Sequence, residues 1–197
     1  TAPADGDYYI GVSGFDNSQY DPTTLGVGSS NPADFTVYNG ELYFTAFTAS
    51  SGRELWKLTS AGVPQLVADI HPAGSSDPRD LTVFNNELFF TADTPAYGRE
   101  IWKINTAGTA SLVTDVFADG SSDPGYLTVF NNALYFAAFT TATGRELWRT
   151  TPGGVASEVE DIDLFGSSDP ADLIVFNNEL YFSASAPTTG RELWKVD

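Results

Sequence analysis

Aromatic side chains stand beside carboxylates, serines and threonines in several predicted loops, and this residue set suits sugar binding. An aromatic ring can stack on the C–H face of a sugar while side-chain oxygens bond its hydroxyls. The ring-bearing candidates are Phe47, Tyr97, Phe139, His71, Phe117 and Phe165. The recurring acidic candidates are Asp77, Asp123 and Asp169. The structural alternative is that the rings cap sheet edges and the aspartates close Ser-Ser-Asp-Pro turns.

Four tryptophans recur in the segment Gly-Arg-Glu-(Leu/Ile)-Trp. They are Trp56, Trp102, Trp148 and Trp194. Spaced tryptophans can serve as sugar platforms, but a tryptophan inside a strand buries a large area and usually fills a core. We therefore expect these side chains to pack between neighbouring sheets.

The positive charges gather in the same segment and at the residue that follows it, which together hold eight of the nine lysines and arginines. Its recurring arginines are Arg53, Arg99, Arg145 and Arg191. A repeated arginine is expected to pair with a repeated carboxylate, and the expected partners are Asp69, Asp115 and Asp161. The alternative is a ring of arginines that binds an anion. The loops outside this segment are left acidic, which favours cations and neutral ligands over anions.

Catalytic chemistry finds little support. His71 is the only histidine and stands in a loop, so no Ser-His-Asp set can be assembled. A carboxylate pair for glycoside hydrolysis needs two acids in different environments, which favours acids that do not recur. Those acids are Asp93, Glu158, Glu160 and Asp163. No cofactor is required; calcium on a propeller axis or in the acidic loops stays open, although no Asp-x-Asp-x-Asp-Gly loop exists.

These residues belong to a repeat of 46 residues, whose Gly-Arg-Glu segments begin at Gly52, Gly98, Gly144 and Gly190. One repeat predicts four strands, at residues 80–85, 87–92, 99–104 and 110–116, because Val, Phe, Tyr, Trp and Thr favour strands. The Asn85-Asn86 pair predicts a tight turn between the first two. Four strands at this period are typical of propeller blades.

We therefore expect one all-β domain over residues 1–197, a closed four-bladed propeller of antiparallel blades. The repeats cover about residues 29–74, 75–120, 121–166 and 167–197. The fourth repeat has three strands, and residues 7–14 supply a spare strand that we expect to complete the last blade by pairing with 191–196. Residues 15–28 are expected to form an irregular connection.

The runs GRELWKL, PQLVADI and DLTVFNNELYF-like segments resemble the bacterial ELWxxDGT repeats of large secreted and surface proteins. The resemblance covers about residues 29–197, and the positions of the DGT portion read LTSAG, INTAG and TTPGG. It implies an extracellular or cell-surface location and propeller-like stacking, and it brings no catalytic residues.

Composition narrows the function classes further. The chain has 197 residues, a net charge of −17 and no cysteine, which disfavours nucleic acid as a partner and excludes disulfides and thiolate sites. The longest apolar run, residues 133–139, is too short to span a bilayer. We expect a non-enzymatic extracellular binding or adhesion module whose favoured ligand is carbohydrate. The alternatives are a self-associating scaffold, with two chains sharing an eight-bladed ring, and a glycoside hydrolase; a monomer is favoured over a homodimer.

Overall fold

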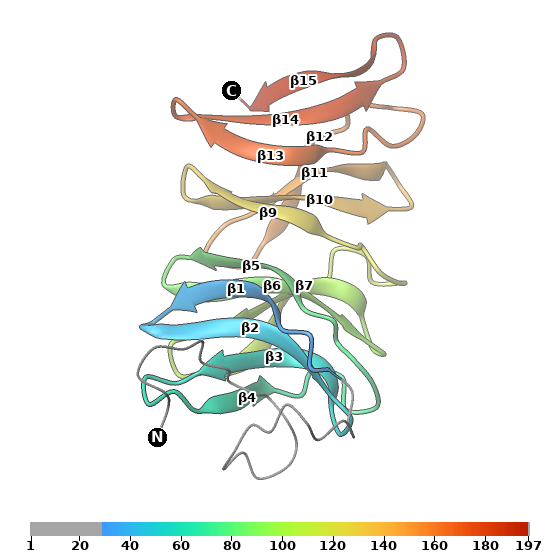
Figure 1. The fold of residues 1–197 in the computed structure, drawn as a ribbon. Helices are drawn as coiled ribbons and strands as arrows, with labels where there is room; N and C mark the ends of the chain where they lie inside the picture. Colours follow the sequence, from blue (N-terminus) through green and yellow to red (C-terminus); the bar gives the residue numbers. More distant parts are fainter. Residues whose placement is uncertain (1–28, 197) are drawn as a thin grey trace.

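The computed structural model describes residues 29–196, which form four antiparallel sheets (Figure 1). Sheet one contains β1 (Ala33–Tyr38), β2 (Glu41–Thr48), β3 (Gly52–Leu58) and β4 (Pro64–Ala68). Sheet two contains β5 (Arg79–Phe84), β6 (Glu87–Thr94), β7 (Gly98–Ile104) and β8 (Ala110–Thr114). Sheet three contains β9 (Gly125–Phe130), β10 (Ala133–Thr140), β11 (Gly144–Thr150) and β12 (Ala156–Glu160). Sheet four contains β13 (Ala171–Phe176), β14 (Glu179–Ala186) and β15 (Gly190–Val196).

The strands follow one another in chain order within each sheet, as predicted from the repeat. Asn85 and Asn86 form the tight turn between β5 and β6, with φ of 48° and 59°. Asparagine tolerates this left-handed geometry, which matches the twist of a two-residue hairpin. The same turn recurs one repeat later at Asn131 and Asn132. No described residue belongs to a helix, so none forms a helix able to cross a membrane.

Large apolar side chains fill the space between successive sheets. At the first junction, Tyr43 and Leu55 of sheet one pack with Phe90 and Trp102 of sheet two. The next two junctions repeat this pattern, with Trp148 and Trp194 packed against their clusters. The side of each sheet that carries the tryptophan therefore faces the preceding sheet, and the opposite side faces the following sheet. We call them the front face and the back face.

The predicted packing of the tryptophans between neighbouring sheets is confirmed for three of them. Trp102, Trp148 and Trp194 each lie against a hydrophobic cluster formed by two successive sheets. Trp194 also donates its indole N–H to the carbonyl of Ala184 at 3.1 Å. Trp56 differs, because its cluster contains only Phe44, Ala46 and Leu58 of its own sheet.

A loop clasp joins each of the first three sheets to the next. In sheet two, the buried carboxylate of Glu100 accepts the N–H of Ser122 at 2.8 Å, its hydroxyl at 2.7 Å and the N–H of Val116 at 3.2 Å. The carbonyl of Ser122 then accepts the N–H of Phe139 in sheet three at 2.8 Å. Equivalent clasps form at Glu54 with Ser76 and at Glu146 with Ser168.

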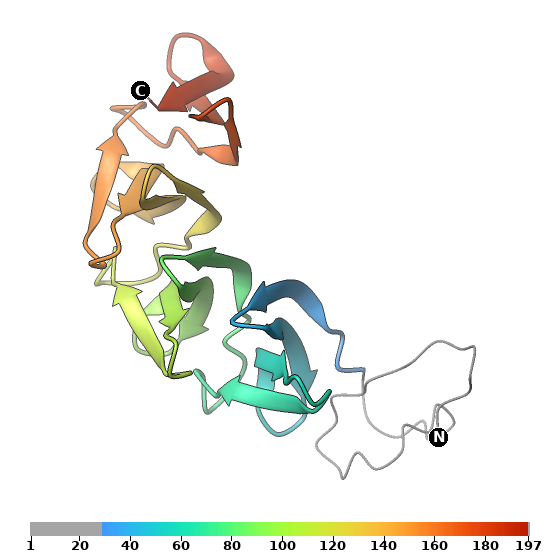
Figure 2. The ribbon, with the colours of Figure 1, turned by 90° about the vertical axis from the view of Figure 1, so that its left-hand side faces the viewer.

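The four sheets form an open, curved row in which the first and last lie at opposite ends (Figures 1 and 2). The contacts between sheets run from β1 to β5, from β5 to β9 and from β9 to β13. The closed four-bladed ring predicted from the sequence is therefore not formed by residues 29–196. The packing of bulky side chains at each junction sets the curvature, and three such junctions produce an arc. The predicted strand at residues 7–14 and the connection at 15–28 lie outside the described residues.

Candidate functional site

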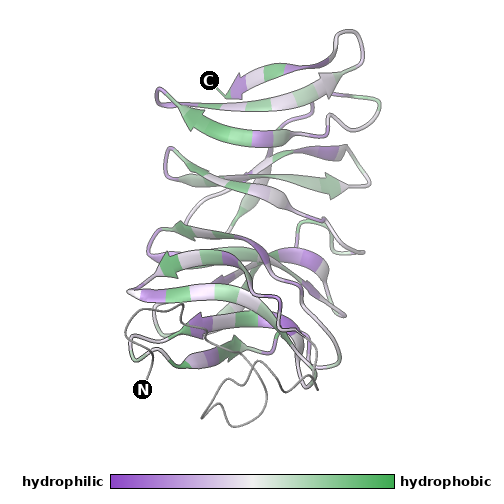
Figure 3. Cartoon of the chain, viewed as in Figure 1, coloured by the Kyte–Doolittle hydropathy of each residue, from purple (hydrophilic) through white to green (hydrophobic). Residues whose placement is uncertain are grey.

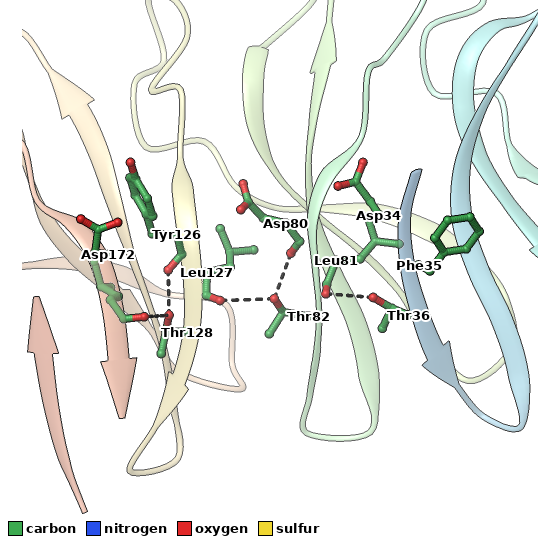
Figure 4. A pocket seen from close by; sticks show the side chains of 11 residues that line it. Asp34, Phe35, Thr36, Asp80, Leu81, Thr82, Tyr126, Leu127, Thr128 and Asp172 are labelled. Carbon is green, nitrogen blue, oxygen red and sulfur yellow. Dashed lines mark hydrogen bonds between the residues drawn. The ribbon is translucent and has the colours of Figure 1, made fainter. Parts of the chain in front are cut away.

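The innermost strands β1, β5, β9 and β13 lie side by side and line a groove of about 420 Å³ (Figure 4). Equivalent positions of the four repeats contribute Asp34, Asp80, Tyr126 and Asp172. Figure 4 shows these four side chains pointing to the same side of the row of strands. We call this feature the inner groove. The third repeat thus places an aromatic ring where the other three place a carboxylate.

A β-bulge in each inner strand determines the direction of these side chains. The pairing of β1 with β2 shifts between Ala33 and Thr36, and the same shift recurs in the other three sheets. The residues at the four bulges have left-handed φ angles of 54°, 56°, 61° and 56°. Aspartate tolerates this conformation, whereas a bulky residue such as Tyr126 is strained in it. Bulges and strained residues gather at functional sites because they re-aim side chains.

Threonine hydroxyls hold the inner strands together beneath the groove. Thr82 contacts the carbonyl of Asp80 at 2.9 Å and that of Leu127 in the next sheet at 3.3 Å. Thr128 makes the same two contacts one repeat later, with Tyr126 at 2.9 Å and Leu173 at 3.4 Å. Figure 4 shows this ladder crossing from strand to strand. The bulges are therefore fixed from one side, which leaves the acidic and aromatic side chains on the other.

The charge of the inner groove is negative, and its acids affect one another. Burial and, second, the nearby carboxylate of Asp34 raise the pKa of Asp80. Arg79, the N–H of Tyr126 and Arg99 act in the opposite direction. The groove is therefore suited to neutral or cationic groups that can donate hydrogen bonds to carboxylates.

A second groove of about 580 Å³ lies where sheet one meets sheet two. Asp34 and Asp77 line it together with Arg53 and Arg79. This groove differs from the inner groove because it carries both signs of charge.

The loops that follow the second strands lie next to the loops that link the sheets, as the sequence predicted. Phe139 and Phe165 line one groove of about 400 Å³. Phe47 lines another of about 340 Å³ together with Pro72 and Ser75. The ring of Phe117 stands edge-on to that of Phe139, with centroids 5.9 Å apart. We call these features the loop-end grooves.

The remaining ring-bearing candidates, Tyr97 and His71, lie in different loops. Tyr97 is 40% exposed in the loop between β6 and β7. His71 has a buried Nδ1 with no hydrogen-bond partner, and its ring occupies the space that a side chain at position 74 would need. His71 lies in the loop between β4 and β5, which links sheets one and two, whereas the loop of Tyr97 belongs to sheet two.

The recurring aspartates of the Ser-Ser-Asp-Pro loops have left-handed φ angles of 42°, 45° and 47°. These are the values for Asp77, Asp123 and Asp169. None of the three lines a loop-end groove among those described. The carboxylates of Asp77 and Asp123 lie 3.9 Å from the guanidinium groups of Arg53 and Arg99.

The predicted partners of the repeated arginines are wrong. The guanidinium of Arg99 donates to the carbonyl of Asp77 at 2.9 Å and to the hydroxyl of Thr91 at 3.2 Å. Its nearest carboxylate is that of Asp123, at 3.9 Å. Arg53, Arg145 and Arg191 donate in the same way to the carbonyls of Asn31, Asp123 and Asp169. Asp69, Asp115 and Asp161 form no ion pair with an arginine among the described residues.

The position of the Ser-Ser-Asp-Pro loop accounts for these arginine contacts. The loop brings a backbone carbonyl within reach of the third strand, 22 residues away in sequence, and the planar guanidinium can donate several hydrogen bonds there. The carboxylates of Asp115 and Asp161 each keep one buried oxygen without a partner.

The acids that do not recur each have their own neighbours. Glu158 accepts the hydroxyl of Thr143 at 2.7 Å, and Asp163 accepts the N–H of Phe165 at 3.1 Å. Asp93 stands opposite Arg99 in the β6–β7 ladder, and Glu160 opposite Leu147 in the β11–β12 ladder. Within residues 29–196, no group of three or more His, Asp and Glu could hold a metal ion.

The inner groove was not predicted, although the sequence contains a signal for it. Positions 34, 80, 126 and 172 are 46 residues apart, and three hold aspartate while one holds tyrosine. Aspartate beside a strand of β-branched residues is a mark of a left-handed bulge. One repeat that differs at such a position, as Tyr126 does, indicates a functional residue more directly than residues that recur in every repeat.

No family model and no curated protein sequence matches the chain. Among solved structures, it is similar to a protein assigned as a gluconolactonase, with a TM-score of 0.52 and 15% identity over 79% of this chain and 58% of that chain. A puromycin hydrolase mutant complexed with PGG matches with a TM-score of 0.56 and 14% identity, over 84% of this chain and 27% of that chain. Bacteroides ovatus xyloglucan PUL GH43B matches with a TM-score of 0.45 and 16% identity, over 86% of this chain and 38% of that chain.

The chain has a β-propeller-like fold. It spans less than two thirds of the length of each of these three structures.

Proposed function

We propose that the chain is a non-enzymatic extracellular binding module whose ligand is a carbohydrate held in the inner groove. The observation that carries this proposal is Tyr126, a strained and 45% exposed ring between Asp80 and Asp172 in the row of inner-strand side chains. Three repeats fill this position with aspartate, which fits the backbone at little cost. A strained aromatic in one repeat is best explained by a use for its ring.

Carbohydrate is the ligand class that matches this chemistry. A tyrosine face stacks on sugar C–H groups, and carboxylates accept hydrogen bonds from vicinal hydroxyls. A neutral ligand also agrees with the net charge of −17, which repels polyanions. The groove is open and of moderate size, which suits a saccharide end or a short chain segment.

The recurrence of the acids argues for binding and against catalysis. Asp34, Asp80 and Asp172 occupy equivalent positions, whereas a hydrolase needs one acid and one base in different environments. One observation favours a glycoside hydrolase as the second candidate: the raised pKa of Asp80 is what a general acid requires. The binding test therefore includes a search for turnover of any glycan that is bound.

The loop-end grooves are the second candidate location for the ligand, because they combine phenylalanines with threonine and serine hydroxyls. Each sheet offers a similar loop, so binding there would be weak and multivalent. The inner groove predicts one main site, centred on one tyrosine. Calcium is not required in either location, and a partner at the cell surface would present the glycan.

The test is a glycan array with the wild-type chain, run with and without EDTA, followed by titration of any hit. Tyr126→Asn removes the ring and is expected to weaken binding at least about tenfold, the equivalent of about 1.4 kcal/mol. Tyr97→Asn is the matched control, because Tyr97 is exposed to a similar degree but lies in a loop.

Loss of binding in Phe139→Ala, with Tyr126→Asn unaffected, would move the site to the loop-end grooves. Tight binding to heparin or DNA at physiological salt would contradict the charge argument. No binding to any glycan, with and without calcium, would overturn the carbohydrate proposal.

A further inference from the structure

Sheet four has the glutamate and the arginine that bond the next loop in the other sheets, at Glu192 and Arg191. In the described part of the chain these two residues bond no following loop. In the first three sheets the third strand begins under a Ser-Ser-Asp-Pro loop. Ser121 accepts the N–H of Arg99 at 3.0 Å, and the N–H of Asp123 reaches the carbonyl of Arg99 at 3.2 Å. The corresponding groups of Arg191 make no such bonds with described residues.

The glycines at the start of the third strands show the same contrast. A side chain at Gly52 would come within 2.2 Å of the carbonyl oxygen of Gly74, and one at Gly144 within 2.3 Å of that of Gly166. A side chain at Gly190, at a similar φ of 74°, would meet nothing within 4 Å. The space that the loop fills in other sheets is therefore open in sheet four.

The carboxylate beside this space also lacks its usual partners. Glu54, Glu100 and Glu146 are fully buried and accept three hydrogen bonds each. Glu192 is exposed and accepts none from any described residue. The back face behind it is apolar and open: Leu193 is 75% exposed and Phe176 is 62% exposed. Figure 3 colours much of β13 on this sheet as hydrophobic.

The opposite end of the row carries the complementary piece. Ser29-Ser30-Asn31-Pro32 is the first copy of the loop, and the N–H and hydroxyl of Ser30 have no carboxylate partner among the described residues. Pro32 is exposed, whereas Pro78, Pro124 and Pro170 are buried. Phe35, on the next strand, is 59% exposed, while the equivalent Leu127 is 8% exposed. Each end of the row therefore holds what the other end needs.

We propose that a second copy of this chain docks head to tail on sheet four. Its loop 29–32 fills the space above Gly190, Ser30 donates to Glu192, and its strand β1 lies along the back face at Phe176 and Leu193. The occupant is a second copy because the two ends of one chain lie at opposite ends of the row (Figure 1). The proposed contact has the same geometry as the three junctions between sheets inside the chain, so the two surfaces already have matching shapes and bonding groups. It is a heterologous contact, which closes a ring or extends a filament.

The first experiment is sedimentation velocity of the full chain over a range of concentrations. The wild-type chain is expected to associate. Leu193→Asp on the tail and Phe35→Asp on the head are each expected to abolish association, because both place a charge in the contact. Leu164→Asp is the matched control, since Leu164 is also 75% exposed but lies in a loop between sheets three and four.

Mixing the two defective variants decides the geometry. Each retains one intact end, so an equimolar mixture is expected to form a one-to-one dimer that neither variant forms alone. Association of Phe35→Asp by itself would show a symmetric tail-to-tail contact and overturn the proposal. A wild-type chain that stays monomeric at every concentration would also overturn it.

A cross-linking experiment identifies the two partners, since the chain has no cysteine. The double variant Ser30→Cys, Glu192→Cys is treated with a short bis-maleimide. A ladder of covalent multimers is the expected product, and each single variant should give none. A cross-linked species of monomer mass alone would show that one chain joins its own ends, which contradicts the proposal.

Discussion

The third strands of sheets two and four are nearly the same in sequence and opposite in environment. β7 reads GREIWKI and β15 reads GRELWKV. Glu100 and Ile101 are fully buried, whereas Glu192 and Leu193 are exposed. Burial in this fold is thus a property of the junction that a strand makes. Each third strand has the same apolar and acidic side chains, and they become buried and hydrogen-bonded only where a following loop and sheet cover them.

The largest expected contrast is between Ile101 and Leu193. Ile101→Ala should lower the free energy of unfolding by about 2–5 kcal/mol, because it opens a cavity between sheets two and three. Leu193→Ala should change it by less than about 0.5 kcal/mol in the monomer, because the side chain is exposed. Urea unfolding of both variants at low protein concentration measures the two values. Similar losses would mean that Leu193 is covered in solution.

The clasp carboxylates give the next contrast. Glu100→Gln replaces one acceptor oxygen with an amide, so a buried N–H of Ser122 or Val116 loses its partner. This should cost about 1–3 kcal/mol. Glu192→Gln should cost close to nothing in the monomer, since Glu192 accepts no bond from a described residue. The same unfolding measurement compares them, and a stable Glu100→Gln variant would refute the importance of the clasp.

The clasps also make stability depend on pH. Burial raises the pKa of Glu54, Glu100 and Glu146 above the ordinary value of 4.5, although the bonds from serine oppose this. The folded state therefore holds more protons than the unfolded state in the range between the ordinary and the raised pKa. Stability is greatest below that range and falls as pH rises through it.

This pH dependence can be separated from the effect of net charge. The free energy of unfolding is measured by urea at a series of pH values from about 4 upwards, a range set by the ordinary glutamate pKa. Glu100→Gln should lose less stability over this range than the wild-type chain does. Glu192→Gln removes the same charge and should keep the wild-type slope. Identical slopes for all three proteins would contradict the buried-carboxylate explanation.

The strands and the hairpin turns could be predicted because their signals are local. The Val, Phe and Thr residues of β5 and β6 favour strands, and the Asn85-Asn86 pair favours the turn between them. The partners of Arg99 and the open row could not be predicted. Both depend on how a loop from a distant part of the repeat folds back on the third strand, and sequence spacing does not encode that distance.

The inner groove falls between these two cases. The step of 46 residues that joins Asp80 to Tyr126 is visible in the sequence, but the bulge that aims both side chains to one side is a property of the folded ladder. The aromatic loop ends were predicted to lie together, and Phe139 and Phe165 do so. The recurring Asp123 is not among the residues that line the loop-end grooves.

The smallest expected effect separates the third repeat from the other three. Tyr126 has a φ of 61°, which a tyrosine adopts only under strain, while the equivalent aspartates accept the same conformation. Tyr126→Asn should therefore raise the free energy of unfolding by up to about 1 kcal/mol, the lower end of the left-handed penalty. Tyr97→Asn controls for the loss of an exposed ring, because Tyr97 has no left-handed φ, and it should bring no gain.

A gain in stability at Tyr126 that accompanies a loss of glycan binding would mean that this position trades stability for a use of its ring. Thermal unfolding of both variants, beside the binding titration, provides the two numbers. If Tyr126→Asn were no more stable than the wild-type chain, the ring would be supported by packing that offsets the strain. The tyrosine of the third repeat would then serve packing, and the main argument for a binding site in the inner groove would be lost.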